Sequence, residues 1–123
     1  MKNFVIIKLE QDGFHYWPDP PEKYAFLGQK HRHKFFIEVK IEQQSEHYRQ
    51  IEIIAAKEMI RDILEENFIL CDEPYPNHFN FGQNSCEKIA EIIFNDINAT
   101  LPYKPVQYVK VLEDNENGGM ISA

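Results

Sequence analysis

The sequence predicts an α+β domain in which two helices cover one side of an antiparallel β-sheet. Residues 31–42 alternate between apolar or histidine side chains and mostly charged ones, which is the period of a strand with one buried face. Residues 53–66 repeat apolar side chains at the period of a helix. Strand-like segments precede and follow two helical segments, and this order is typical of an α+β layer.

The first strand is expected at residues 2–9, which are rich in β-branched and aromatic side chains. Asp12-Gly13 indicates a turn, after which residues 14–17 can resume the strand. Residues 18–21 contain three prolines, which remove backbone donors and restrict the residues before them. This segment is therefore expected to be a loop.

The second half of the chain supplies the remaining elements. Residues 71–83 predict a long loop, and loops of this length in small domains are often functional. A second helix is expected to begin in the capping box of residues 84–87. Strands at 106–112 and 120–121, joined by a turn at 114–119, complete the order strand, strand, helix, helix, strand, strand.

Length, charge and cysteine content narrow the class of protein. The 123 residues suit one domain, and the 13 Lys and Arg are dispersed within a net charge of −7, which argues against duplex nucleic acid as a partner. No apolar run reaches the roughly 18 residues that cross a bilayer, and the N-terminal run is too short for a signal peptide. Cys71 and Cys86 are expected to stay reduced. We therefore expect a cytoplasmic domain with neither a membrane nor nucleic acid as partner.

Three histidines form a candidate metal site. His31 and His33 lie two apart on the predicted strand, so their side chains leave one face roughly 7 Å apart at about 3.3 Å per residue. His15 ends the preceding strand, and an adjacent antiparallel strand can place it beside the pair. Three histidines with an open fourth position describe a catalytic type of zinc site. The alternative interpretation is ordinary half-exposed polar residues, because histidine is commonly of intermediate burial.

Five segments follow the order of a known family's motifs. They are a histidine before a Pro-x-x-Pro-Glu loop (14–22), Gly-x-x-His-x-His (28–33), Ile-Glu-Ile with a downstream lysine (51–57), Ser-Cys-Glu-x-x-Ala (85–90) and a strand that ends in glutamate (109–113). Taken together they resemble the 6-carboxy- and 6-pyruvoyl-tetrahydropterin synthase family, over most of the chain.

The resemblance implies the tunnelling fold, with one such domain over residues 1–123. That fold has a four-stranded antiparallel sheet in the order ββααββ, with two helices on one face, and its subunits join their sheets into a barrel with sites between them. It also implies Zn²⁺ on His15, His31 and His33, and a carboxylate at Glu113 that anchors a pterin or purine. A carboxylate can accept two parallel hydrogen bonds from an amino-pyrimidinone edge.

The chain departs from the family's pattern at the residues that move protons. Leu27 stands where the family has its catalytic cysteine, and leucine can neither carry a proton nor act as a nucleophile. The family's Asp-His pair has no match. Arg32 replaces a glycine between the two zinc histidines, where it either contacts a ligand phosphate or faces water as a surface arginine.

Two functional hypotheses follow from the resemblance. The first is a zinc-dependent carbon–oxygen lyase of weak or divergent activity on a reduced pterin such as dihydroneopterin triphosphate. Its substitute base would be Glu22, Asp72, Glu73 or His78, although charged loop residues are mostly just solvated. The second is a catalytically inactive protein that binds or sequesters a pterin, purine or nucleotide. Either would act as a homo-oligomer, a trimer or hexamer; an unrelated function is the third possibility.

Overall fold

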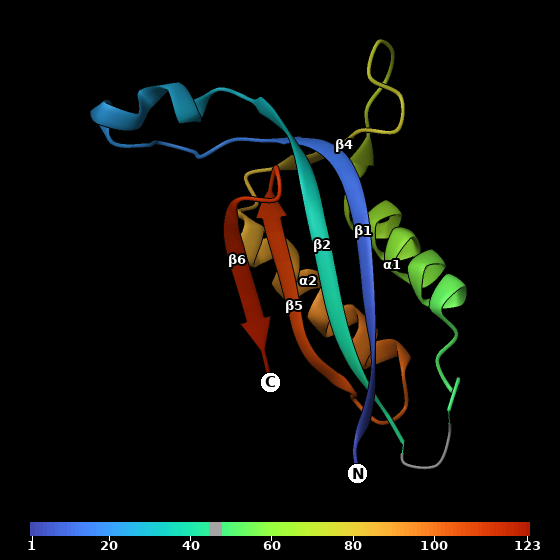
Figure 1. Cartoon of the computed structure of the whole chain (residues 1–123). Coiled ribbons are helices and arrows are strands. Elements are labelled where there is room, and N and C mark those ends of the chain that lie inside the picture. The colour runs from blue at the N-terminus through green and yellow to red at the C-terminus, as the bar shows by residue number, and fades with distance from the viewer. Residues whose placement is uncertain (45–47) are drawn as a thin grey trace.

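The computed structural model describes residues 1–44 and 48–123, and shows one twisted sheet with helices on one of its faces (Figure 1). The sheet consists of six strands: β1 (Asn3–His15), β2 (His31–Gln43), β3 (Ile69–Leu70), β4 (Phe79–Gly82), β5 (Val106–Glu113) and β6 (Asn117–Ser122). The helices are α1 (Ile53–Asn67), α2 (Cys86–Thr100) and the short 3₁₀ helix η1 (Glu22–Gly28), which lies between β1 and β2. The α+β class predicted from the sequence is confirmed.

The β1–β2 hairpin forms the centre of the sheet. Its strands are 13 residues long and pair antiparallel from Asn3 opposite Gln43 to His15 opposite His31. β5 pairs antiparallel with β2, and β6 with β5. On the other side β4 pairs with β1 in parallel, which completes the order β3-β4-β1-β2-β5-β6. The sheet is therefore mixed.

The observed sheet differs from the predicted four antiparallel strands by two additional strands. β4 lies inside residues 71–83, which the sequence predicts to be a loop. β3 and β4 are only two and four residues long, too short to show the alternation that identifies a strand. The four long strands and the two helices keep the expected ββααββ order. The sheet of one copy is open, and its assembly into a barrel stays a prediction.

The turn predicted at Asp12-Gly13 is wrong, because β1 continues through both residues to His15. Within β1, Gly13 serves the packing of a neighbouring strand. It pairs with Phe79 on β4, and a Cβ atom at this position would collide with the ring of Phe81. The glycine therefore allows β4 to approach β1 closely, as glycines inside strands often do.

The core lies between the sheet and the two α-helices. On β2 the buried positions are Phe35, Ile37, Val39 and Ile41, which alternate with half-buried side chains on the opposite face. From the helices Ile60 and Leu64 of α1 and Ile89, Ile93 and Ile97 of α2 are fully buried against them. Full burial of an aliphatic side chain contributes about 1.5–3 kcal/mol. The alternation predicted for residues 31–42 is confirmed, and its buried face is the one that the helices cover.

Both α-helices begin at a side chain that caps a backbone amide. Glu52 accepts a hydrogen bond from the Ala55 amide at 2.8 Å, and the Ser85 hydroxyl accepts one from the Lys88 amide at 3.2 Å. The second helix therefore starts one residue later than a cap at Asn84 would place it. Within residues 1–44 and 48–123, neither α-helix is long and apolar enough to cross a membrane.

Candidate metal centre

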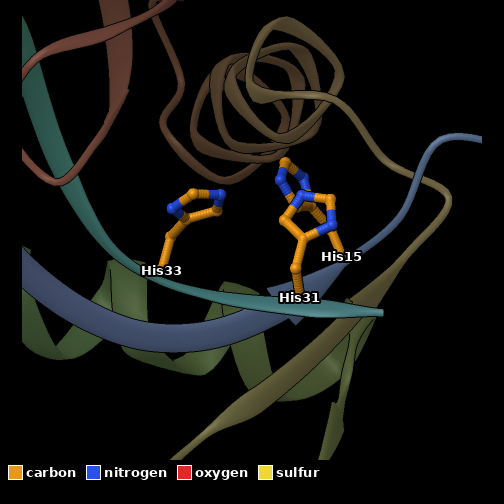
Figure 2. Close-up of side chains that lie close together, drawn as sticks. All are labelled: His15, His31 and His33. Carbon is orange, nitrogen blue, oxygen red and sulfur yellow. The ribbon is translucent and has the colours of Figure 1, made fainter. Parts of the chain in front are cut away.

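The structure brings His15, His31 and His33 together at the end of the β1–β2 hairpin (Figure 2). His15 is directly opposite His31 in the antiparallel register, and His33 is two residues further along β2. The ring centroids of the three pairs are 4.7 to 5.4 Å apart. One ring nitrogen from each histidine lies within 4.8 Å of the other two. The rings stand on the helix-covered face of the sheet, near the start of α2.

Each ring is held at its Nδ1 atom by an oxygen from outside the cluster. The acceptors are the Asn84 carbonyl for His15 at 3.0 Å, the Gln29 carbonyl for His31 at 2.9 Å and the Asp114 carboxylate for His33 at 2.7 Å. Carbonyl and carboxylate oxygens only accept hydrogen bonds, so Nδ1 carries the proton in all three rings. A ring that is neutral in this tautomer has its lone pair on Nε2, and outer partners of this kind orient histidine ligands in metal sites.

Glu113, the last residue of β5, reaches the cluster with both oxygens. Its Oε1 is 2.9 Å from Nε2 of His15 and its Oε2 is 3.4 Å from Nε2 of His33. Burial of the His15 ring would lower its pKa, but the hydrogen bonds with Glu113 and Asn84 outweigh burial and raise the pKa above 6.5. The hydrogen bond with His15 in turn holds the pKa of Glu113 below its ordinary value. The two pKa shifts therefore favour an ion pair between the Glu113 carboxylate and His15.

Cys86, the first residue of α2, lies behind Glu113. Its side chain is buried, with Sγ at 3.7 Å from Oε1 of Glu113. Burial and the neighbouring carboxylate raise the pKa of this thiol to about 12. Cys86 is therefore a neutral donor to Glu113 and not a nucleophile. Cys71 is half-buried, and neither cysteine forms a disulfide.

The cluster lines a pocket of about 530 Å³. The three histidines and Glu113 are among its polar lining residues. Tyr16, Trp17 and Leu27, from the connection between β1 and β2, lie on the same pocket, and so do Ser85 and Glu87 from the start of α2. Leu27, which the sequence places where the family has a cysteine, thus borders the site as an apolar group.

The candidate bases lie elsewhere in the chain. Glu22 begins η1 and is exposed, while Asp72 and Glu73 line a separate pocket of about 350 Å³ beside Phe14. His78 contacts Arg32, with Nε2 at 3.2 Å from the guanidinium. None of the four lines the pocket that holds the histidines. One copy of the chain therefore does not bring them to the cluster, and their catalytic roles stay predictions.

Sequence reasoning missed the groups that orient the histidines. Two of them are backbone carbonyls, which any residue type can supply, so no sequence signal identifies them. The third is Asp114, which reads as part of an ordinary turn. Its position directly after Glu113 is the one hint, because loops held by a rigid scaffold often carry binding residues.

The comparisons agree with this architecture. No protein-family model and no curated protein sequence matches the chain. Among solved structures, 6-pyruvoyl tetrahydropterin synthase from Caenorhabditis elegans aligns over 100% of this chain and 96% of its own, with a TM-score of 0.69 and 10% identity. The fold of this chain resembles that of the 6-pyruvoyl tetrahydropterin synthase structure. The uncharacterized protein WS1659 from Wolinella succinogenes aligns over 99% and 98% of the two chains, with a TM-score of 0.59 and 8% identity. At such identities the likeness shows the fold alone.

The two cysteines should differ in reactivity. In the folded protein we expect iodoacetamide to alkylate Cys86 at least about tenfold more slowly than Cys71, because only the thiolate reacts and burial keeps Cys86 protonated. Peptide mass spectrometry over time measures both rates. In denaturant the two should react alike, which serves as the control. Equal rates in the folded protein would contradict the burial and hydrogen bonding described for Cys86.

Proposed function

We propose that this chain is a tunnelling-fold protein that binds Zn²⁺ through Nε2 of His15, His31 and His33 and takes a reduced pterin, or a related purine, beside the metal. The observation that carries the proposal is the arrangement of the three rings. Their Nδ1 atoms all face outside acceptors, and one ring nitrogen of each histidine lies within 4.8 Å of the other two. Glu113 is the carboxylate that contacts Nε2 of His15 and of His33.

The donor set suits zinc. Three neutral imidazoles leave a fourth position for a ligand atom, which is the composition of catalytic zinc sites. When bound, Zn²⁺ would act as a Lewis acid that polarises an oxygen of the ligand. The protein's part is to hold the rings in one tautomer, and metal binding would displace the hydrogen bond between Nε2 of His15 and Glu113.

Glu113 is proposed to anchor the ligand once the metal is in place. Nε2 of His15 cannot donate to Glu113 and bind a metal at the same time, so metal binding would release the carboxylate from this partner. The freed oxygens can then accept hydrogen bonds from an amino-pyrimidinone edge. Trp17 and Tyr16 border the same pocket and offer aromatic surface to a flat ring.

Two outcomes are possible for such a bound pterin. The chain is either a lyase of the pterin-synthase type that acts on dihydroneopterin triphosphate, or a binding protein without turnover. Leu27 borders the pocket at the place of the expected cysteine and favours binding with weak or absent turnover. Turnover would require Glu22, Asp72, Glu73 or His78 to reach the ligand from a neighbouring copy. We propose a cytoplasmic location, with which the two free thiols agree.

Removal of a single ring should abolish tight metal binding. We expect the unchanged protein to bind one Zn²⁺ per chain. Loss of a residue that only orients a metal ligand typically lowers metal affinity by roughly 10–100-fold. His31→Ala removes a ligand itself, so its affinity for Zn²⁺ should fall by more than this. Competition with a chromophoric chelator measures the affinity. His78→Ala is the matched control, because His78 lies outside the cluster and should leave the affinity unchanged. Equal losses in both variants, or no zinc binding by the unchanged protein, would contradict the proposal.

Substitution of Glu113 should weaken ligand binding, whether or not the protein turns the ligand over. We expect zinc-loaded protein to bind dihydroneopterin triphosphate in calorimetric titration, and Glu113→Ala to bind it about tenfold or more weakly, because hydrogen bonds to a charged group contribute about 1.5–3 kcal/mol. Product formation, followed by chromatography, should be weak or absent. Family-like turnover that is lost on substitution of Glu22, Asp72, Glu73 or His78 would instead identify the lyase and its base. Unchanged binding by Glu113→Ala would refute the anchoring role.

Assembly is part of the proposal, because strand edges attract further strands. β6 forms one edge of the sheet over Asn117–Ser122 and offers unpaired backbone groups to another copy. Closing a barrel from several copies would pair them. Light scattering at micromolar concentration should therefore show a trimer or a hexamer. A stable monomer would exclude sites between subunits.

A further inference from the structure

The turn after β5 places a second carboxylate beside the metal centre. The Glu116 amide donates to the Glu113 carbonyl at 2.9 Å, and between them Asp114 and Asn115 have φ angles of 54° and 60°. Two consecutive positive φ values define a type I′ turn, in which Asp and Asn are among the best tolerated residues. The turn therefore keeps Asp114 beside β2, where its amide donates to the Lys34 carbonyl at 2.7 Å.

Both oxygens of the Asp114 carboxylate are engaged on β2. Oδ2 lies 2.7 Å from Nδ1 of His33, and Oδ1 accepts a hydrogen bond from the Lys34 amide at 3.0 Å. The amide fixes the carboxylate relative to the strand, and the carboxylate fixes the ring. His33 is the only one of the three histidines whose outer partner is a side chain with a charge.

We infer that Asp114 is the positioning residue of the metal centre: its carboxylate holds the His33 ring in the Nδ1–H tautomer and thereby sets the affinity of Nε2 for the metal. The inference rests on the proposed function and extends it to a residue that does not itself touch the metal. A carboxylate behind a histidine also raises the basicity of the ligand nitrogen, which a neutral carbonyl does less strongly.

Asparagine cannot replace Asp114 in this role, although it has the same shape and also tolerates positive φ. Two donors face the carboxylate, the Lys34 amide and Nδ1–H of His33, whereas asparagine offers one oxygen and one NH₂ group. With its oxygen on the Lys34 amide, the NH₂ group faces His33 and requires a lone pair on Nδ1. The proton then moves to Nε2, where it occupies the metal-binding nitrogen.

The first measurement reads the tautomer directly. Long-range ¹H–¹⁵N correlation spectra of metal-free protein at about pH 8.5, above the range in which most histidines titrate, distinguish protonated from unprotonated ring nitrogens. We expect Nδ1–H for His33 in the unchanged protein, and Nε2–H or a mixture in Asp114→Asn. His31, whose acceptor is a backbone carbonyl, should keep Nδ1–H in both proteins and serves as the internal control.

The second measurement is the affinity for Zn²⁺ in chelator competition, with Co²⁺ absorption as a check of ligand geometry. Asp114→Asn should bind Zn²⁺ about 10–100-fold more weakly than the unchanged protein. Glu116→Gln removes the same charge from the same turn at an exposed position, and should stay within about twofold. The Asp114 side chain is itself 50% exposed, so the variant should remain folded, which circular dichroism checks.

The outcomes separate this inference from the proposed function. An Nε2–H tautomer of His33 in the unchanged protein would overturn the role of Asp114, whatever the metal affinities. Equal zinc affinity of Asp114→Asn and the unchanged protein would also overturn it, while the three-histidine site would stand. Absence of zinc binding by the unchanged protein would overturn the proposed function and, with it, the effect of Asp114 on affinity.

Discussion

The register of the β1–β2 hairpin is the constraint on which the site depends. Side chains alternate between the faces of a strand, so a slip of one residue would turn every side chain of β2 to the other face. Phe35, Ile37, Val39 and Ile41 would then leave the core, at a cost of several kcal/mol by the burial they would lose. His31 and His33 continue the same alternation. The face of the sheet from which they project is therefore secured by the apolar residues that follow them, while the Nδ1 partners orient the rings.

The centre combines this rigid base with partners from three other segments. The hairpin supplies the rings, the approach to α2 supplies the Asn84 carbonyl, the connection through η1 supplies the Gln29 carbonyl, and β5 with its turn supplies Glu113 and Asp114. Two acidic residues in a row serve opposite sides of the same histidine. Glu113 lies at Nε2 of His33 and Asp114 at its Nδ1. A strand that ends beside the cluster and a turn that reverses at once make both contacts possible.

The sequence was sufficient to predict the elements whose side chains follow a regular period. The alternation over residues 31–42 identified β2 and its buried face, and the His-x-His spacing with His15 identified the cluster. It was insufficient where a position depends on a distant neighbour. Gly13 is typical of a turn, but in the fold it allows the ring of Phe81 to approach the backbone closely. β4 is too short for its side chains to show an alternating pattern. The Asn84 and Gln29 carbonyls belong to the backbone, so their residue types do not indicate a role. Asp114 favours a turn in any protein, and only the fold shows that this turn faces His33.

The connection between His15 and His31 is less constrained by the sheet than the two strands that it joins. It projects from the end of the sheet (Figure 1), and the pairing of β1 with β2 does not depend on its length. Yet it carries Trp17 and Leu27, which border the pocket. Insertions, deletions and substitutions in this segment can reshape the wall that meets a ligand while the three rings stay in place. Under the proposed function, the preference for a ligand and the capacity to hold a metal can thus evolve as separate traits.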